Sequence, residues 1–433
     1  MKSLCLIIGL LFLAPVLPKN PIEDITLDKN HKVESTFSGN IDGEDSFHLI
    51  IAKNLNAKTY DIIPYHYSSG EVIKLKTISF SKLPNVLSFH NNDNVLSLIA
   101  KSKEGKSEKI RVLDLDLKTG ETKKSDSFST DDFKAIIRQK NRNVLLYADK
   151  ESIKLVDATS AISTKTINVK PDESALEFFK TLSNNSIDAI NNNEFVANGS
   201  INDFRAYFEE NTLTITQEDT KEGLTNMIQI PMENGNDLTV VAKELKSESV
   251  SGKIKKSTSY FSEDKLYQLR LNKDEAKLDV FDLSNASNKT VDMLEDSFKS
   301  LVSNKNKSEG FLKNSSKNSN APTLTTNKAN NGNIKLRFDY VNKNTYKYRY
   351  NWWWHHHWMM QQMMWHQQQQ MHMRASGFGP NPIEDIYWYK EEQTHFEIGL
   401  DNSGNLISTE GLETVHKDID KKKYVDELDE NKS

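Results

Sequence analysis

Short apolar or alternating stretches recur along the chain between residues 40 and 300, and Gly, Asn, Asp or Ser bounds each of them. Alternation of apolar and polar positions is typical of a β-strand buried on one face, and turn-forming residues at both ends keep each strand short. Helix signals are few, and the best are Glu173–Leu182 and Met293–Val302. Strands are predicted at Phe47–Ala52, Val72–Ile78, Val95–Ala100, Ile110–Leu117, Val144–Ala148, Ile153–Val156, Phe204–Phe208, Leu213–Thr216, Leu266–Leu271 and Leu278–Leu283.

One unit, a strand that reaches Asp and then a short polar turn, repeats imperfectly in this region. The copies are KIRVLDLDLKTGET (Lys109 to Thr122), IKLVDATS (Ile153 to Ser160) and KLDVFDLSNAS (Lys277 to Ser287), with weaker versions at Tyr65 to Ile73 and Leu213 to Asp219. Intervals of about 40 to 65 residues match one four-stranded propeller blade. Residues 40–300 thus resemble a β-propeller, without a WD, Kelch or Asp-box signature. The resemblance implies a mainly β fold with a propeller-like domain at 30–302 and an open number of blades; a β-sandwich is the alternative.

The composition changes after residue 302. Residues 303–333 are rich in Asn, Ser, Lys and Thr and poor in large apolar groups, so little burial offsets the entropy of ordering them, and we expect a linker. Residues 334–416 predict a smaller C-terminal β region, with strands at Ile386–Tyr389, His395–Leu400 and Leu406–Thr409. Residues 417–433 are highly charged and predict a solvated tail.

Residues 1–20 have the features of a secretory signal peptide. Lys2 precedes an apolar stretch from Leu4 to Leu17 that is too short to span a bilayer. Cleavage stays open, because no small-x-small site follows. Cys5 is the single cysteine, so a mature chain would hold no disulfide. We expect an exported protein of a bacterial cell envelope, periplasmic or associated with the outer membrane, with no transmembrane span in the mature chain.

Composition and motifs argue against two functional classes. With 36% hydrophobic residues, 27% charged residues and a net charge of -5, the chain is ordinary for a soluble protein and gives no reason to expect nucleic acid. It has no GxSxG elbow, P-loop, HExxH or strand-following GxGxxG motif. No companions at ligand spacing accompany His31, His48, His66 and His90, so we expect surface or packing roles for them. The prediction is a non-enzymatic protein without a cofactor.

Residues 351–373 (NWWWHHHWMMQQMMWHQQQQMHM) hold five of the six Trp, five of the eleven His and six of the ten Met. The run has no Pro, Gly or β-branched residue and favours one long helix. Large Trp and pliable Met surfaces are typical of adaptable protein contacts. We therefore expect a binding or scaffold protein, such as a subunit of an outer-membrane or secretion-type complex, that docks a protein partner through Trp352, Trp353, Trp354, Trp358 and Trp365.

The alternative function for the same run is binding of copper or another soft metal. On a helix, side chains four residues apart lie on one face, and imidazole with thioether in the absence of carboxylate is what Cu(I) favours. A third hypothesis is contact with a membrane interface, where Trp is enriched, although six Gln and five His make a spanning helix unfavourable. The copper ligands would be His355, His356, Met359, Met360, Met363, Met364, His366 and His372.

Overall fold

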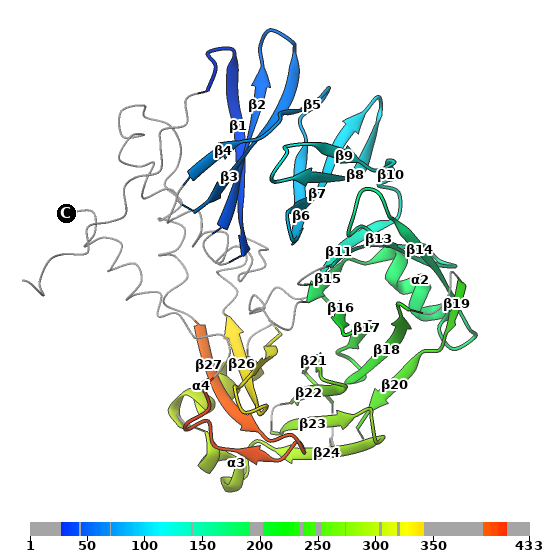
Figure 1. Cartoon of the computed structure of the whole chain (residues 1–433). Helices are drawn as coiled ribbons and strands as arrows, with labels where there is room; N and C mark the ends of the chain where they lie inside the picture. Colours follow the sequence, from blue (N-terminus) through cyan, green and yellow to red (C-terminus); the bar gives the residue numbers. More distant parts are fainter. Residues whose placement is uncertain are drawn as a thin grey trace, which may run out of the picture. The chain divides into compact units, whose positions relative to one another are not determined.

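Mainly antiparallel sheets make up most of the regular structure, and each is built mainly from strands that follow one another along the chain (Figure 1). Within the described residues there are six sheets of four or five strands, called here the first to the sixth sheet in chain order. The same part of the chain contains three helices, α2 (Leu176–Asn184), α3 (Asp296–Leu301) and α4 (Lys305–Lys317). The computed structural model describes residues 27–42, 45–69, 71–139, 142–190, 202–233, 237–247, 253–272, 274–302, 305–317, 321–341 and 393–413.

The first sheet lies in one of the chain's two compact units, whose described part comprises residues 27–42, 45–69, 71–83 and 119–121. Its central strand β3 pairs with β2 on one side and with both β4 and β5 on the other. The strands are β1 (His31–Asp42), β2 (Asp45–Asn54), β3 (Thr59–Ser68), β4 (Glu71–Lys74) and β5 (Ile78–Phe80).

The remaining sheets belong to the second unit. The second sheet comprises β6 (Asn85–Asn92), β7 (Val95–Glu104), β8 (Ser107–Asp116), β9 (Thr122–Lys124) and β10 (Phe128–Ser129). The third comprises β11 (Phe133–Gln139), β12 (Arg142–Ala148), β13 (Ile153–Asp157), β14 (Lys165–Pro171) and β19 (Asp237–Val240). The fourth comprises β15 (Ile187–Ile190), β16 (Phe204–Glu209), β17 (Thr212–Asp219), β18 (Leu224–Pro231) and β20 (Lys243–Lys246).

The last two sheets have four strands each, in simple sequence order. The fifth comprises β21 (Lys256–Ser262), β22 (Lys265–Leu271), β23 (Ala276–Asp282) and β24 (Ser287–Asp292). The sixth comprises β25 (Thr323–Lys328), β26 (Ile334–Val341), β27 (Gln393–Leu400) and β28 (Leu406–Ile407).

The Asp of the repeated unit has the same role in its three best copies. Its carboxylate accepts a hydrogen bond from the backbone N–H two residues further on, which makes an Asx turn at the end of the strand. The donors are Lys118 N to Asp116 (2.9 Å), Thr159 N to Asp157 (3.1 Å) and Ser284 N to Asp282 (3.0 Å). These Asp residues end β8, β13 and β23, each the third strand of its sheet. The repeat predicted from the sequence is therefore a structural repeat.

Neighbouring sheets of the second unit meet through strands β6, β11, β16, β21 and β25, which contact one another in that order. Four-stranded meanders that adjoin along one strand each are the building pattern of propeller blades. The fold is therefore mainly β and β-propeller-like, as the sequence predicts. The predicted helices at Glu173–Leu182 and Met293–Val302 are also present, as α2 and α3.

A strand crossover joins the third and fourth sheets. β19 follows β18 along the chain, yet it pairs in parallel with β14 at the edge of the third sheet. The chain then returns, and β20 pairs with β18 at the edge of the fourth sheet. At the crossing, Asp172 N donates to Val240 O and Ala242 N donates to Ser174 Oγ, both at 3.0 Å. Ten consecutive residues, 237–246, therefore complete two different sheets.

The structure corrects the predicted linker at 303–333, because this stretch contains α4 and β25. Phe311 of α4 is fully buried, and one well-placed aromatic side chain anchors a helix that composition alone does not predict. The region 334–416 is also not separate, since Phe338 and Phe396 share one core with Leu266 and Leu278 of the fifth sheet. The predicted strands at 395–400 and 406–409 correspond to β27 and β28. The predicted signal peptide, the predicted strand at Ile386–Tyr389 and the predicted charged tail lie outside the described residues.

Candidate functional site

The residues predicted to bind a partner or copper, from Trp352 to His372, lie outside the described residues, as does the predicted helix. The structure does show where the chain enters and leaves this part of the sequence. β26 and β27 are paired neighbours in the sixth sheet, and their register runs from Ile334 opposite Leu400 to Val341 opposite Gln393. Residues 342–392, which include the Trp/His/Met run, are therefore the connection of a β-hairpin.

The hairpin is anchored by stacked aromatic rings. Phe338 of β26 and Phe396 of β27 lie opposite each other, with ring centroids 4.6 Å apart and planes 3° from parallel. Phe311 of α4 packs edge-on against Phe396 at 5.2 Å, and Phe298 of α3 packs against the same ring at 6.3 Å. All four side chains are buried. The two ends of the connection are thus held by a well-packed core.

A layer of buried polar side chains lies between the fourth and fifth sheets. Ser257 Oγ of β21 donates to the Glu218 carboxylate of β17, and Gln268 Nε2 of β22 donates to Thr225 Oγ1 of β18 at 3.1 Å. Arg205 of β16 donates to the backbone oxygen of residue 259 and, at 3.3 Å, to the hydroxyl of residue 258. Each of the five named side chains is at most 5% exposed. Buried polar groups need such partners, so the layer fixes how these two sheets pack.

Glu218 has the most unusual electrostatic environment in this layer. Burial raises the pKa of its carboxyl group above the ordinary value, and the nearby Arg205 guanidinium and the hydroxyls of Ser257 and Ser259 offset only part of this effect. A raised carboxyl pKa in a cleft is a mark of general acid catalysis. Here, however, Glu218 is not among the residues that line the pocket described below. The arrangement can hold a proton between two sheets, which is a structural role.

A second buried polar cluster joins the second and third sheets. Asn143 of β12 accepts a hydrogen bond from Ser88 Oγ at 3.0 Å, and its Nδ2 lies 3.1 Å from His90 Nδ1. Nearby, the carboxylate of Asp114 accepts hydrogen bonds from Ser97 Oγ (2.8 Å) and from the backbone N–H of residue 161 (2.9 Å). Burial lowers the pKa of His90, so the ring favours the neutral form. His90 therefore has a packing role, as expected.

The first sheet contains His31, His48 and His66, which also have packing roles. His31 Nε2 lies 3.0 Å from Asp61 Oδ2. Burial acts to raise the pKa of Asp61, but its hydrogen bonds, of which that with His31 is the strongest, outweigh burial. The pKa of Asp61 is therefore below its ordinary value. His48 Nδ1 lies 2.6 Å from Ser38 Oγ, and both side chains are buried. His66 is buried with no hydrogen bond to either ring nitrogen within the described residues. The Ser38 and His48 contact resembles a nucleophile and base, but it is enclosed in the sheet.

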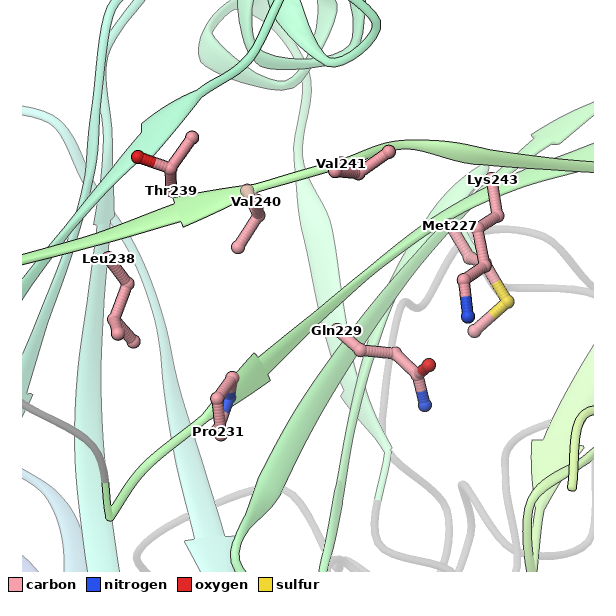
Figure 2. Close-up of a pocket in the computed structure, with 8 residues that line it drawn as sticks. All are labelled: Met227, Gln229, Pro231, Leu238, Thr239, Val240, Val241 and Lys243. Atoms are coloured by element: carbon pink, nitrogen blue, oxygen red, sulfur yellow. The ribbon is translucent and has the colours of Figure 1, made fainter.

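A small open pocket lies beside the crossover (Figure 2). Leu238, Val240 and Val241 border it from the crossover, while Met227 and Gln229 border it from β18. β20 stops pairing with β18 at Met227, so the pocket lies where the sheet edge continues alone. Its volume of about 230 Å³ is below the usual range for cofactor and small-molecule sites, about 300–1,000 Å³. The pocket carries no pair of catalytic groups.

In the part of the chain that the structure describes, no group of three or more His, Cys, Asp or Glu side chains is placed to hold a metal ion. None of the helices described here is long and apolar enough to cross a membrane.

Comparisons with known proteins give similarity of structure only. No protein-family model matches the chain, and no curated protein matches it. The β-propeller domain of the Trilobed protease from Pyrococcus furiosus is similar at 9% identity and a TM-score of 0.31, over 72% of this chain and 79% of that one. The WD40 domain of SCAP from fission yeast matches at 8% identity and a TM-score of 0.29, over 62% and 67%. For Pyrococcus horikoshii acylaminoacyl peptidase the values are 9%, 0.29, 72% and 44%. At these levels no residue or activity is carried over.

Proposed function

We propose that the protein is an exported, non-enzymatic binding or scaffold protein of a cell envelope, and that it docks a protein partner through residues 351–373. The observation that carries the proposal is the concentration of five Trp and six Met in one uncharged run. Trp is among the commonest residues at the energetic centres of protein interfaces. Because this run is the richest source of such side chains in the chain, it is the best candidate for a binding element.

The sixth sheet supports this proposal by the way it presents the run. Both strands that flank the connection are paired along their whole length and anchored by the Phe338 and Phe396 stack. Lys335 and Arg337 of β26 also pair with Glu397 of β27, at 3.3 and 3.8 Å. Function is commonly carried by loops on a rigid scaffold. A stable hairpin can therefore carry a large connection without depending on it for its own fold.

The second candidate function, soft-metal binding, is favoured by the spacing of His355, Met359 and Met363. Imidazole and thioether at intervals of four residues would suit Cu(I) on a helix. No partner protein is required by this alternative, so the two functions predict different dependence on the side chains of the same run.

Two sets of substitutions in the full chain separate these functions. The first changes Trp352, Trp353 and Trp354 to Ala, and the second changes His355, His356, Met359, Met360, Met363 and Met364 to Ala. Docking predicts that the Trp variant loses the partners retained by the unchanged chain in the native host, with each buried Trp worth about 2 kcal/mol or more. Copper binding predicts that only the His/Met variant loses bound copper, as measured by elemental analysis after chelator washing.

A third variant controls for folding. Because Val341 and Gln393 are paired, a short Asn-Gly turn in place of residues 342–392 can close the hairpin. Its circular dichroism and thermal unfolding should match those of the full chain. If this variant keeps both its partners and its copper, both functions are contradicted. Intact mass and fractionation of the native protein test export, and an unprocessed cytoplasmic chain would contradict it.

A further inference from the structure

Asn-x-Ser/Thr triplets, which are acceptor motifs for N-linked glycans, occur in the sequence at several places. They begin at Asn184, Asn198, Asn285, Asn288, Asn306, Asn314 and Asn431. In a chain so rich in Asn and Ser, triplets of this kind also arise by chance, so the motif alone selects none of them. The structure describes the acceptor side chains of Asn184, Asn285 and Asn288, and it separates the three.

Two of these triplets have one of their reacting groups already engaged. Nδ2 of Asn184, the atom that would receive the sugar, donates to Lys180 O at 2.9 Å at the end of α2. In the triplet of Asn288, the Thr290 hydroxyl donates to Asp279 Oδ1 at 2.5 Å, and Asp279 is fully buried. Transfer at either site would have to displace a hydrogen bond of the folded chain.

The triplet of Asn285 has both groups available. Asn285 and Ala286 are exposed in the turn between β23 and β24, and Ser287, the first residue of β24, is also exposed. Oδ1 of Asn285 accepts the Ser287 N–H at 3.0 Å, and Ala286 has the left-handed backbone, φ 54°, that this tight turn requires. Among the residues that the structure describes, none accepts a hydrogen bond from Nδ2 of Asn285. β24 is the outer strand of the fifth sheet, so a bulky group at its start meets no further strand of that sheet.

We propose that Asn285 is an N-linked glycosylation site. In the transfer, Nδ2 forms a bond to the anomeric carbon of an oligosaccharide carried on a polyprenyl diphosphate. The bond between that carbon and the diphosphate oxygen breaks, the diphosphate leaves with the electron pair, and one Nδ2 proton passes to a base of the transferase. The inference rests on the proposed export, because donor and transferase act on chains that enter a secretory or envelope compartment. A glycan here would also shield the edge strand β24 from pairing with other chains.

To test this inference, the full chain is produced in yeast as a secreted protein. Mass spectrometry with fragmentation then locates the glycans on its peptides. We expect most chains to carry a glycan at Asn285 and few to carry one at Asn184 or Asn288. Asn285→Gln and Ser287→Ala should abolish the deglycosidase-sensitive mass shift of the peptide that contains residue 285. Ser287→Thr, which keeps the hydroxyl, and Asn288→Gln, three residues away, should retain it.

A second version of the chain, with the yeast signal in place of residues 1–17, separates glycosylation from export. Glycan at Asn285 in this version alone would support the site and contradict the native signal. Secreted protein that lacks a glycan at Asn285 would overturn the inference whichever signal is used. Equal occupancy at Asn288 would overturn the claim that the folded turn selects Asn285.

Discussion

Arg270 and Asp279 form an ion pair in which neither side chain reaches solvent, with exposures of 1% and 0%. Arg270 Nε on β22 donates to Asp279 Oδ2 on β23 at 2.7 Å. The other carboxylate oxygen accepts the Thr290 hydroxyl of β24, so three strands of the fifth sheet meet at one carboxylate. Two charges without water are stable only while both are present. The pair therefore ties the strands together and leaves a large penalty if one partner is lost.

Asp279→Ala is expected to lower the free energy of unfolding by about 3–5 kcal/mol, because it leaves the Arg270 cation buried without its partner. Replacing both residues, with Arg270→Met and Asp279→Leu, should recover most of that loss. Lys277→Ala is the matched control: its pair with Asp292 is more exposed, and we expect an effect of about 1 kcal/mol or less. Urea denaturation followed by circular dichroism measures all three. A double variant no more stable than the single one would refute this account.

Glu218 should make stability fall as the pH rises. Below pH 4.5, the ordinary pKa of the carboxyl group, Glu218 is protonated in both the folded and the unfolded chain. Its contribution to stability is then fully present. Above pH 4.5 the unfolded chain releases the proton, while burial keeps it on the folded chain. The free energy of unfolding therefore falls as the pH rises, until the pH passes the raised pKa of the folded chain. Its slope is up to about 1.4 kcal/mol per pH unit. The difference between the unchanged chain and Glu218→Gln should show this slope. The exposed Glu410→Gln is the control, and an identical pH profile for Glu218→Gln would contradict the assignment.

The aromatic stack at the base of the long hairpin should contribute strongly to stability. Phe396→Ala removes contacts with Phe338, Phe311 and Phe298 at once, and a loss of about 3–5 kcal/mol is expected. Leu176→Ala, at a position 53% exposed, should change stability by about 0.5 kcal/mol or less. Thermal unfolding of the two variants tests the prediction. Similar midpoints would mean that the sixth sheet does not depend on this core.

The Asx turn at the end of β8 should depend on a side-chain oxygen and not on charge. Asp116→Ala removes the acceptor for Lys118 N, and we expect a loss of about 1 kcal/mol. Asp116→Asn keeps an oxygen in the same place and should retain most of the stability. Equilibrium denaturation of both variants decides between them. Equal losses would show that the negative charge, and not the turn, is what matters.

Several strands whose apolar positions alternate with polar ones are predicted from the sequence, and β21, whose buried face is partly polar, is missed. The strand predicted at Leu278–Leu283 ends within one residue of the end of β23. The sequence predicts it because Leu278 and Val280, which face the core, are apolar. β21, with the sequence KSTSYFS, was not predicted, since its buried Ser257 and Ser259 look like exposed residues in a sequence. They are buried because the Glu218 carboxylate of β17 is a hydrogen-bond partner for both hydroxyls. Such pairing is a property of the three-dimensional structure.

The candidate sites show the same division. The composition of 351–373 is visible in the sequence, whereas the pairing of Val341 with Gln393, which makes that run a hairpin connection, requires the register of the sixth sheet. The raised pKa of Glu218 also has no sequence signal, because it arises from burial between sheets and from the distance to Arg205. Spacing along the chain describes local chemistry, and these features depend on contacts between distant residues.

The crossover at residues 237–246 links two sheets, because it supplies the last strand of each. During synthesis, β14 has no outer neighbour until β19 emerges, after the first four strands of the fourth sheet. A chain interrupted after Pro231 would expose the edge of β14, which is a template for pairing with other chains. The same ten residues are also an element that two copies can exchange, and reciprocal exchange would produce an intertwined dimer. The crossover that completes both sheets is thus also the segment whose late synthesis leaves the edge of β14 unpaired.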